Sequence, residues 1–114
     1  MNQNEIVRAL NARNVTCNAA INTEYRFAFA SDLMSDVLTV DHENLVLITG
    51  LANTQVIRTA EMADISCVIL ARGKKATDEM VQLAIENKIT LIECEYSMFK
   101  ISGLLYNAGL KPLF

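Results

Sequence analysis

Three short apolar runs within residues 45–93 decide the fold: Leu45-Val-Leu-Ile-Thr-Gly50, Ser66-Cys-Val-Ile-Leu-Ala-Arg-Gly-Lys-Lys75 and Ile89-Thr-Leu-Ile-Glu93. Their apolar residues are consecutive rather than alternating, which is typical of strands in a parallel sheet that helices cover on both faces. Segments of about helix length separate the runs. This order predicts successive βαβ units with right-handed crossovers, and therefore an α/β fold with a mainly parallel sheet and helices on its faces.

The composition predicts one globular domain over residues 1–114, because 114 residues with 52% hydrophobic content can bury a sizeable core. The 10 basic and 13 acidic residues give a formal net charge of −3. The densest basic cluster, Arg72 with Lys74 and Lys75, is too small to indicate a nucleic-acid partner. The polar amino terminus and the absence of a long apolar run predict no signal peptide, no membrane contact and a cytoplasmic location.

The cysteines Cys17, Cys67 and Cys94 are widely spaced and odd in number, which argues against a disulfide framework and fits a reducing compartment. Cys67 and Cys94 lie in the predicted strand regions, where we expect small buried hydrophobic side chains. The sequence contains no Cys-x-x-Cys pair. We therefore predict no metal site and no cofactor.

Helix starts are predicted from residues that favour the N-cap position, namely Asn2 (with Glu5 as its capping-box partner), Ser31 or Asp32, Asn53, Thr77 and Ser97. After Ser31 or Asp32, the inward positions of a short helix are Leu33, Met34, Val37 and Leu38.

Further strands are predicted at Asn14 to Cys17 and at Tyr25 to Ala30, the latter with Tyr25, Phe27 and Phe29 on one face. The polar segment Asn18 to Glu24 is interpreted as a connection.

The last predicted helix, Met98 to Asn107, is apolar nearly all round and is followed by Gly109 and Pro112, which end it. We expect part of its surface, at Ile101, Leu104 and Leu105, to contact a second copy in a homodimer. The alternative is a central core helix that packs only within the chain.

Two turns are expected at the carboxyl edge of the parallel sheet, where ligands bind in open α/β folds. In the first, Gly50, Asn53 and Thr54 offer backbone N–H groups for an anion, or alternatively form a tight turn with an Asn cap. In the second, Arg72-Gly73-Lys74-Lys75 attracts an acidic ligand or partner, or alternatively is a solvated turn.

Catalytic residues are not evident. His42, the only histidine, lies in a polar turn and is expected to be solvent-exposed. Glu93 and Glu95 flank Cys94, and their charges raise a thiol pKa, which argues against a cysteine nucleophile. An ion pair between these carboxylates and the Lys74 loop is the simpler hypothesis.

The chain resembles the DRTGG domain family over Phe29 to Leu110. The stretches that carry the resemblance are Ser31-Asp-Leu-Met-Ser-Asp-Val-Leu38, Leu47-Ile-Thr-Gly-Leu51, Val56-Ile-Arg-Thr-Ala-Glu-Met-Ala-Asp-Ile65, Arg72-Gly-Lys-Lys75 and Gly103-Leu-Leu-Tyr-Asn-Ala-Gly-Leu110. Where the family has its eponymous Asp-Arg-Thr-Gly-Gly motif, this chain reads Gly50-Leu-Ala-Asn-Thr54.

The resemblance implies a fold similar to the amino-terminal domain of HPr kinase/phosphorylase and a regulatory role in dimers rather than catalysis. It also implies a similarity to proteins encoded near iron-only hydrogenase genes in anaerobes. We therefore predict a non-catalytic regulatory, ligand-binding or dimerisation module that binds a small anionic ligand. The alternatives are an accessory protein of iron-enzyme or redox metabolism and, less favoured, a phosphoryl- or acyl-transfer enzyme.

Overall fold

A computed structural model describes residues 1–16 and 23–114. In these residues one six-stranded sheet has the order β1-β5-β4-β3-β2-β6. Its parallel centre consists of β2 (Phe27–Ala30), β3 (Leu45–Thr49), β4 (Cys67–Leu70) and β5 (Thr90–Glu93). Two short edge strands complete it: β6 (Lys111–Pro112) is parallel to β2, and β1 (Arg13–Asn14) is antiparallel to β5. The predicted α/β fold with a mainly parallel sheet is confirmed.

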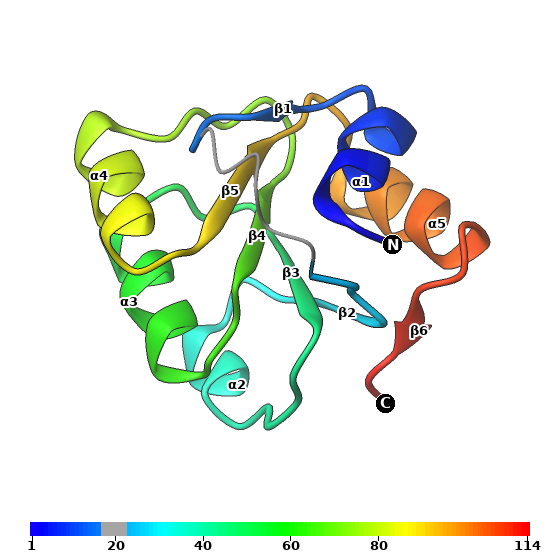
Figure 1. The fold of residues 1–114 in the computed structure, drawn as a ribbon, viewed down its shortest axis with the longest axis horizontal. Coiled ribbons are helices and arrows are strands. Elements are labelled where there is room, and N and C mark those ends of the chain that lie inside the picture. The colour runs from blue at the N-terminus through cyan, green and yellow to red at the C-terminus, as the bar shows by residue number, and fades with distance from the viewer. Residues whose placement is uncertain (17–22) are drawn as a thin grey trace.

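Helices cover both faces of the sheet, as Figure 1 shows. On one face lie α1 (Gln3–Leu10) and α5 (Met98–Asn107), and on the other lie α2 (Met34–Val37), α3 (Thr54–Met62) and α4 (Asp78–Glu86). Every residue of β3, β4 and β5 is buried. Consecutive apolar residues are needed because alternate side chains enter two different cores. Leu47 packs with the α2–α4 layer, whereas Ile48 packs with α1 and α5.

Most predicted helix caps are present. Asn2 and Glu5 form the capping box of α1, and the side chains of Asn53, Thr77 and Ser97 each accept a backbone hydrogen bond at the start of a helix. These caps are local interactions between residues three positions apart, so the sequence alone predicts them.

The predicted cap of α2 is wrong. This helix begins after Leu33 without a side-chain cap, and the Asp32 carboxylate instead accepts the backbone N–H of Gly50. The helix is a single turn, so only Met34 and Val37 are buried, while Leu33 and Leu38 are exposed.

The outer strands differ from the prediction. β1 ends at Asn14, and Cys17 with the connection 18–22 lies outside the described residues. β2 begins at Phe27, and Tyr25 lies in the opposite core from Phe27 and Phe29. The reason is that the N–H groups of Arg26 and Phe27 both donate to the carbonyl of Asn44, which interrupts the alternation of faces.

The packing of α5 corrects the predicted dimer contacts. Ile101 and Leu105 are fully buried among the chain's own side chains, in the core that α5 shares with α1, and only Leu104 is partly exposed. Side chains buried within the chain cannot contact a second copy. Ile101 and Leu105 are therefore core residues.

In the part of the chain that the structure describes, α5 and the other helices are too short or too polar to cross a membrane.

Candidate functional site

A pocket of about 380 Å³ lies at the carboxyl edge of the sheet. The turns after β2, β3 and β4 and the first turn of α5 form its walls, with the lining residues Asp32, Gly50, Ala71, Arg72, Lys74, Ser97, Met98 and Phe99. Three of the predicted ligand-binding residues, Gly50, Arg72 and Lys74, therefore come together in one cavity. This location is where open α/β sheets bind ligands.

The turn after β4 is tied to the turn after β5 by its backbone. The N–H of Arg72 donates to the carbonyl of Tyr96 at 2.7 Å, and the N–H of Gly73 donates to the carbonyl of Cys94 at 2.9 Å. Arg72 and Gly73 have φ angles of 59° and 71°, and a left-handed backbone costs a non-glycine residue about 1–2 kcal/mol. The turn holds the strained Arg72 at the pocket wall. Within the described ranges neither Arg72 nor Lys74 has an ion-pair partner.

The first turn of α5 lines the same pocket with Ser97, Met98 and Phe99, and two of its backbone donors are unused in the described residues. The Ser97 hydroxyl accepts the N–H of Lys100, and the Ser97 carbonyl accepts the N–H of Ile101. The N–H groups of Met98 and Phe99 have no acceptor among residues 1–16 and 23–114. Such groups at the positive end of a helix favour an anion.

Asp32 is the pocket residue whose role sequence reasoning missed. Its Oδ1 accepts the N–H of Gly50 at 2.6 Å and the hydroxyl of the fully buried Thr49 at 3.0 Å. In the described part of the chain Asp32 forms no ion pair with Arg72 or Lys74. The pocket therefore contains both cations and a carboxylate that are not paired with each other. No local signal indicated this, because Ser31 and Asp32 also fit a helix start.

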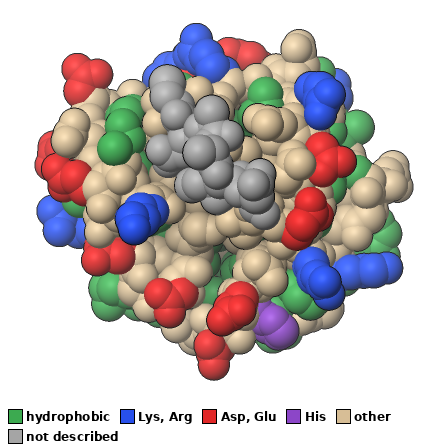
Figure 2. Space-filling view, in the orientation of Figure 1, with side chains coloured by type: hydrophobic (Ala, Val, Ile, Leu, Met, Phe, Trp, Pro, Cys, Tyr) green, Lys and Arg blue, Asp and Glu red, His purple; other side chains and the backbone are tan. Residues whose placement is uncertain are grey.

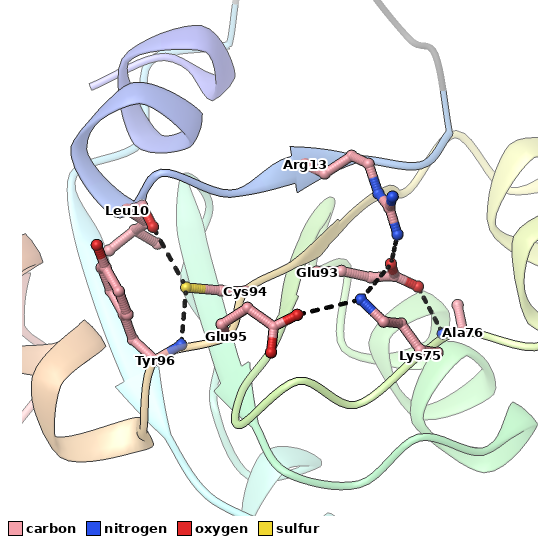
Figure 3. A network of polar contacts seen from close by, with 8 residues as sticks. All are labelled: Leu10, Arg13, Lys75, Ala76, Glu93, Cys94, Glu95 and Tyr96. Atoms are coloured by element: carbon pink, nitrogen blue, oxygen red, sulfur yellow. Dashed lines mark hydrogen bonds and ion pairs between the residues drawn. The ribbon is translucent and has the colours of Figure 1, made fainter.

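The remaining predicted residues lie outside the pocket. Asn53 caps α3 and Thr54 is the first residue of that helix, in agreement with the alternative of a capped turn. Lys75 contacts Glu95 at 3.3 Å and Glu93 at 3.8 Å instead, as Figure 3 shows. The expected ion pair between these carboxylates and the Lys74 loop is thus made by Lys75. Gly73, which does not line the pocket, lies against the same Glu95 carboxylate, because a Cβ at this position would lie 2.6 Å from Glu95 Oε2.

Glu93 is a buried carboxylate that joins three segments (Figure 3). Its Oε1 accepts from the guanidinium of Arg13 on β1, and its Oε2 accepts the N–H of Ala76 at 2.7 Å. Burial by itself raises the pKa of Glu93, but the hydrogen bonds from Arg13 and Ala76 and the charges of Arg13 and Lys75 outweigh it, so the pKa is lowered. The ionised carboxylate thus fastens the loop that carries Arg72 and Lys74.

The described thiols are poor nucleophiles. Burial raises the pKa of Cys67 to about 12, against a smaller opposing effect of its hydrogen bond with Tyr25. Burial also raises the pKa of Cys94, assisted by the charge of Glu95, while the Tyr96 N–H and Lys100 oppose it. The Cys94 side chain points toward Leu10 and the Tyr96 backbone (Figure 3), and away from Glu93. A thiol held protonated is not activated for attack.

The charges on the face drawn in Figure 2 are mixed, with Lys and Arg side chains interspersed among Asp and Glu.

Among the described residues no group of three or more His, Cys, Asp and Glu side chains is placed to hold a metal ion. His42 is exposed and packs against Phe27, with the ring centroids 4.8 Å apart and the ring planes tilted by 47°. It precedes β3 and therefore lies at the amino edge of the sheet, opposite the pocket.

Comparison with known proteins decides the family. The model of the DRTGG domain matches residues 5–108. The chain belongs to the DRTGG domain family. No curated protein matches it. The resemblance seen in the sequence is therefore confirmed, although the eponymous motif is absent from Gly50 to Thr54.

A solved structure has the same fold as this DRTGG domain. It contains the CBS and DRTGG domains of the regulatory region of Clostridium perfringens pyrophosphatase, in complex with the activator diadenosine tetraphosphate. The match has a TM-score of 0.76 at 20% sequence identity and covers 90% of this chain. This DRTGG domain spans 45% of the length of that chain, so the likeness shows the fold that the two proteins share.

Proposed function

We propose that this DRTGG domain is a non-catalytic regulatory module that binds a small phosphate-bearing anion in the carboxyl-edge pocket. The observation that carries the proposal is that Arg72 and Lys74 line one cavity together with Met98 and Phe99, whose N–H groups have no acceptor among the described residues. Charge-assisted hydrogen bonds and helix N-termini are the groups that hold phosphates in proteins. The regulatory region of the pyrophosphatase, which shares this fold, supports a regulatory role.

The placement of the reactive side chains supports binding rather than catalysis. Cys94 is buried with a raised pKa, and Glu93 is engaged by Arg13, Ala76 and Lys75. His42 lies at the other edge of the sheet. A nucleophile and a base within hydrogen-bond reach of each other define an active centre, and these groups do not converge on the pocket. The buried thiols are compatible with the reducing cytoplasm that we propose as the location.

The proposal is tested by thermal-shift measurements with phosphorylated metabolites. A ligand that binds the native state raises the free energy of unfolding, by about 2.7 kcal/mol when its concentration is a hundredfold above its Kd, and this raises the midpoint temperature of unfolding. Arg72→Ala with Lys74→Ala should abolish the shift. The matched control is Arg58→Ala with Lys88→Ala, which removes the same charge from exposed positions outside the pocket. A shift that survives the first double substitution would refute the site.

We also propose that the domain is a homodimer through the carboxyl-terminal half of α5, at Gly103, Leu104 and Tyr106. Tyr106 is 65% exposed, and aromatic side chains are enriched at interfaces. Gly103 lies on the same side of the helix, three residues earlier, and its Cβ position faces open space. A second helix can approach closely at such a glycine. This surface replaces the one centred on the buried Ile101 and Leu105.

The alternative role, an accessory protein that acts through protein contacts in iron-enzyme or redox metabolism, predicts a different result. Such a protein would gain no stability from small anions. It would retain its partner when Arg72 and Lys74 are replaced.

A further inference from the structure

The rim of the carboxyl-edge pocket carries an aromatic ring that the anion-binding groups do not require. Phe99 lines the cavity with 90% of its surface exposed. A phenylalanine so exposed loses apolar burial without an evident structural gain, since α5 is already held by Ile101 and Leu105. A flat ring beside cations is the arrangement on which nucleobases stack.

The carboxylate of Asp32 is the second feature that a simple anion does not require. A negative charge in the pocket opposes phosphate binding at short range. Its Oδ1 is used by Gly50 and Thr49, whereas Oδ2 has no hydrogen-bond donor within the described ranges. An acceptor of this kind suits the hydroxyl groups of a ribose, which acidic side chains bind in nucleotide sites of other α/β folds.

We propose that the ligand of this pocket is a mononucleotide, with its phosphate at Arg72, Lys74 and the N–H groups of Met98 and Phe99, its base on the Phe99 ring and its ribose hydroxyls at Asp32. This inference rests on the proposed anion-binding function and adds the ligand class. The three kinds of group line one cavity of about 380 Å³, and Asp32 is not paired with the cations in the described residues. A ligand that carries an anion, hydroxyls and an aromatic base satisfies all of them together.

Isothermal titration calorimetry of the intact chain tests the ligand class. The probes are the four ribonucleoside 5′-monophosphates, ribose 5-phosphate, which lacks the base, and adenosine, which lacks the phosphate. At least one mononucleotide should bind about fivefold or more tighter than ribose 5-phosphate, because stacking of one base contributes about five- to 150-fold in affinity. Adenosine should bind more weakly than its monophosphate.

Two variants separate the base from the phosphate. Phe99→Ala should remove the advantage of the nucleotide over ribose 5-phosphate. Phe114→Ala, which truncates another ring with 90% exposure beside Phe29 and outside the pocket, should leave it unchanged. Arg72→Ala with Lys74→Ala should weaken both ligands, because the phosphate is common to them.

The outcomes distinguish the two proposals. If ribose 5-phosphate binds as tightly as every mononucleotide, or if Phe99→Ala leaves the nucleotide advantage intact, the mononucleotide inference is overturned. The anion-binding function then still stands, provided that the double substitution abolishes phosphate binding. If none of the probes binds, the mononucleotide inference is overturned, and the thermal-shift screen of other phosphorylated metabolites decides the anion-binding function. If the probes bind and the double substitution changes nothing, both proposals are overturned.

Discussion

Arg13 and Glu93 stand opposite each other in the antiparallel pairing of β1 with β5, and the Arg13 guanidinium donates to the Glu93 carboxylate. The carboxylate is buried, whereas the guanidinium is largely exposed. Glu93 also accepts the N–H of Ala76. One side chain thus fastens the edge strand β1 and the loop between β4 and α4, whose earlier residues line the pocket.

Arg13→Ala should lower the free energy of unfolding by about 1–2 kcal/mol at pH 7, because a buried charged acceptor loses one donor. Lys75→Ala should cost about 0.5 kcal/mol or less, because its closer contact is with the exposed Glu95. Urea titrations of the two variants and the wild type give these values. An equal loss of stability in Lys75→Ala and Arg13→Ala would contradict the assignment of Arg13 as the main cationic partner of Glu93.

The same pair makes stability depend on pH. The folded-state pKa of Glu93 lies below its ordinary value of 4.5, so its ionised form stabilises the fold above pH 4.5, and this contribution is lost as the pH falls through the folded pKa. The difference between wild type and Arg13→Ala should therefore be constant from pH 5 to 7 and shrink below about pH 4. Urea midpoints across this range measure it. A difference that persists undiminished at pH 2 would show that Arg13 acts by packing alone.

Asp32→Ala should destabilise the fold by about 1–3 kcal/mol, because it leaves the buried hydroxyl of Thr49 and the N–H of Gly50 without their acceptor. Asp32→Asn retains a carbonyl oxygen and should cost less. Thermal unfolding of both variants compares them. Equal losses would mean that the charge of Asp32, rather than its acceptor geometry, stabilises the turn.

Two Gly→Ala substitutions should act in opposite directions. Gly73 has a φ of 71° and its Cβ would meet Glu95, so Gly73→Ala should destabilise the fold by about 1–2 kcal/mol. Gly103 lies inside α5 and its Cβ would meet no atom within 4 Å, so Gly103→Ala should stabilise it by about 0.5–1 kcal/mol. Urea unfolding at low protein concentration, which limits any dimer contribution, measures both. A stabilised Gly73→Ala would contradict the geometry of the turn.

Tyr106→Glu should convert the dimer to a monomer, because the charge of the new carboxylate would be buried at the proposed interface. The fold should be retained, because Tyr106 is 65% exposed in the single chain. Met62→Glu on α3, which is 71% exposed, is the matched control and should leave the mass unchanged. Light scattering coupled to size exclusion gives the masses. An unchanged dimer for Tyr106→Glu would reject this surface. A substitution at the buried Leu105 would not test the interface, because a charge placed there should destabilise the fold itself.

Local sequence patterns were sufficient to predict the central architecture. The consecutive apolar residues of β3, β4 and β5 and the caps at Asn2, Asn53, Thr77 and Ser97 are local signals, and the structure confirms them. They are readable because a strand covered on both faces and a capped helix depend on residues a few positions apart. The order of strands and helices also predicts that the turns after β3 and β4 meet at one edge, which brings Gly50, Arg72 and Lys74 together.

Local patterns did not predict which side chains line the pocket and which lie outside it. Asp32 accepts the N–H of Gly50 instead of capping a helix. Phe99, which is distant from Asp32 in the sequence, lines the same pocket. Lys75 turns to Glu95, although its neighbour Lys74 lines the pocket. On α5, Ile101 and Leu105 are covered by the core shared with α1, while Tyr106 stays exposed. Each of these outcomes depends on contacts between distant segments, and short-range patterns carry no information about which of several nearby partners a side chain takes.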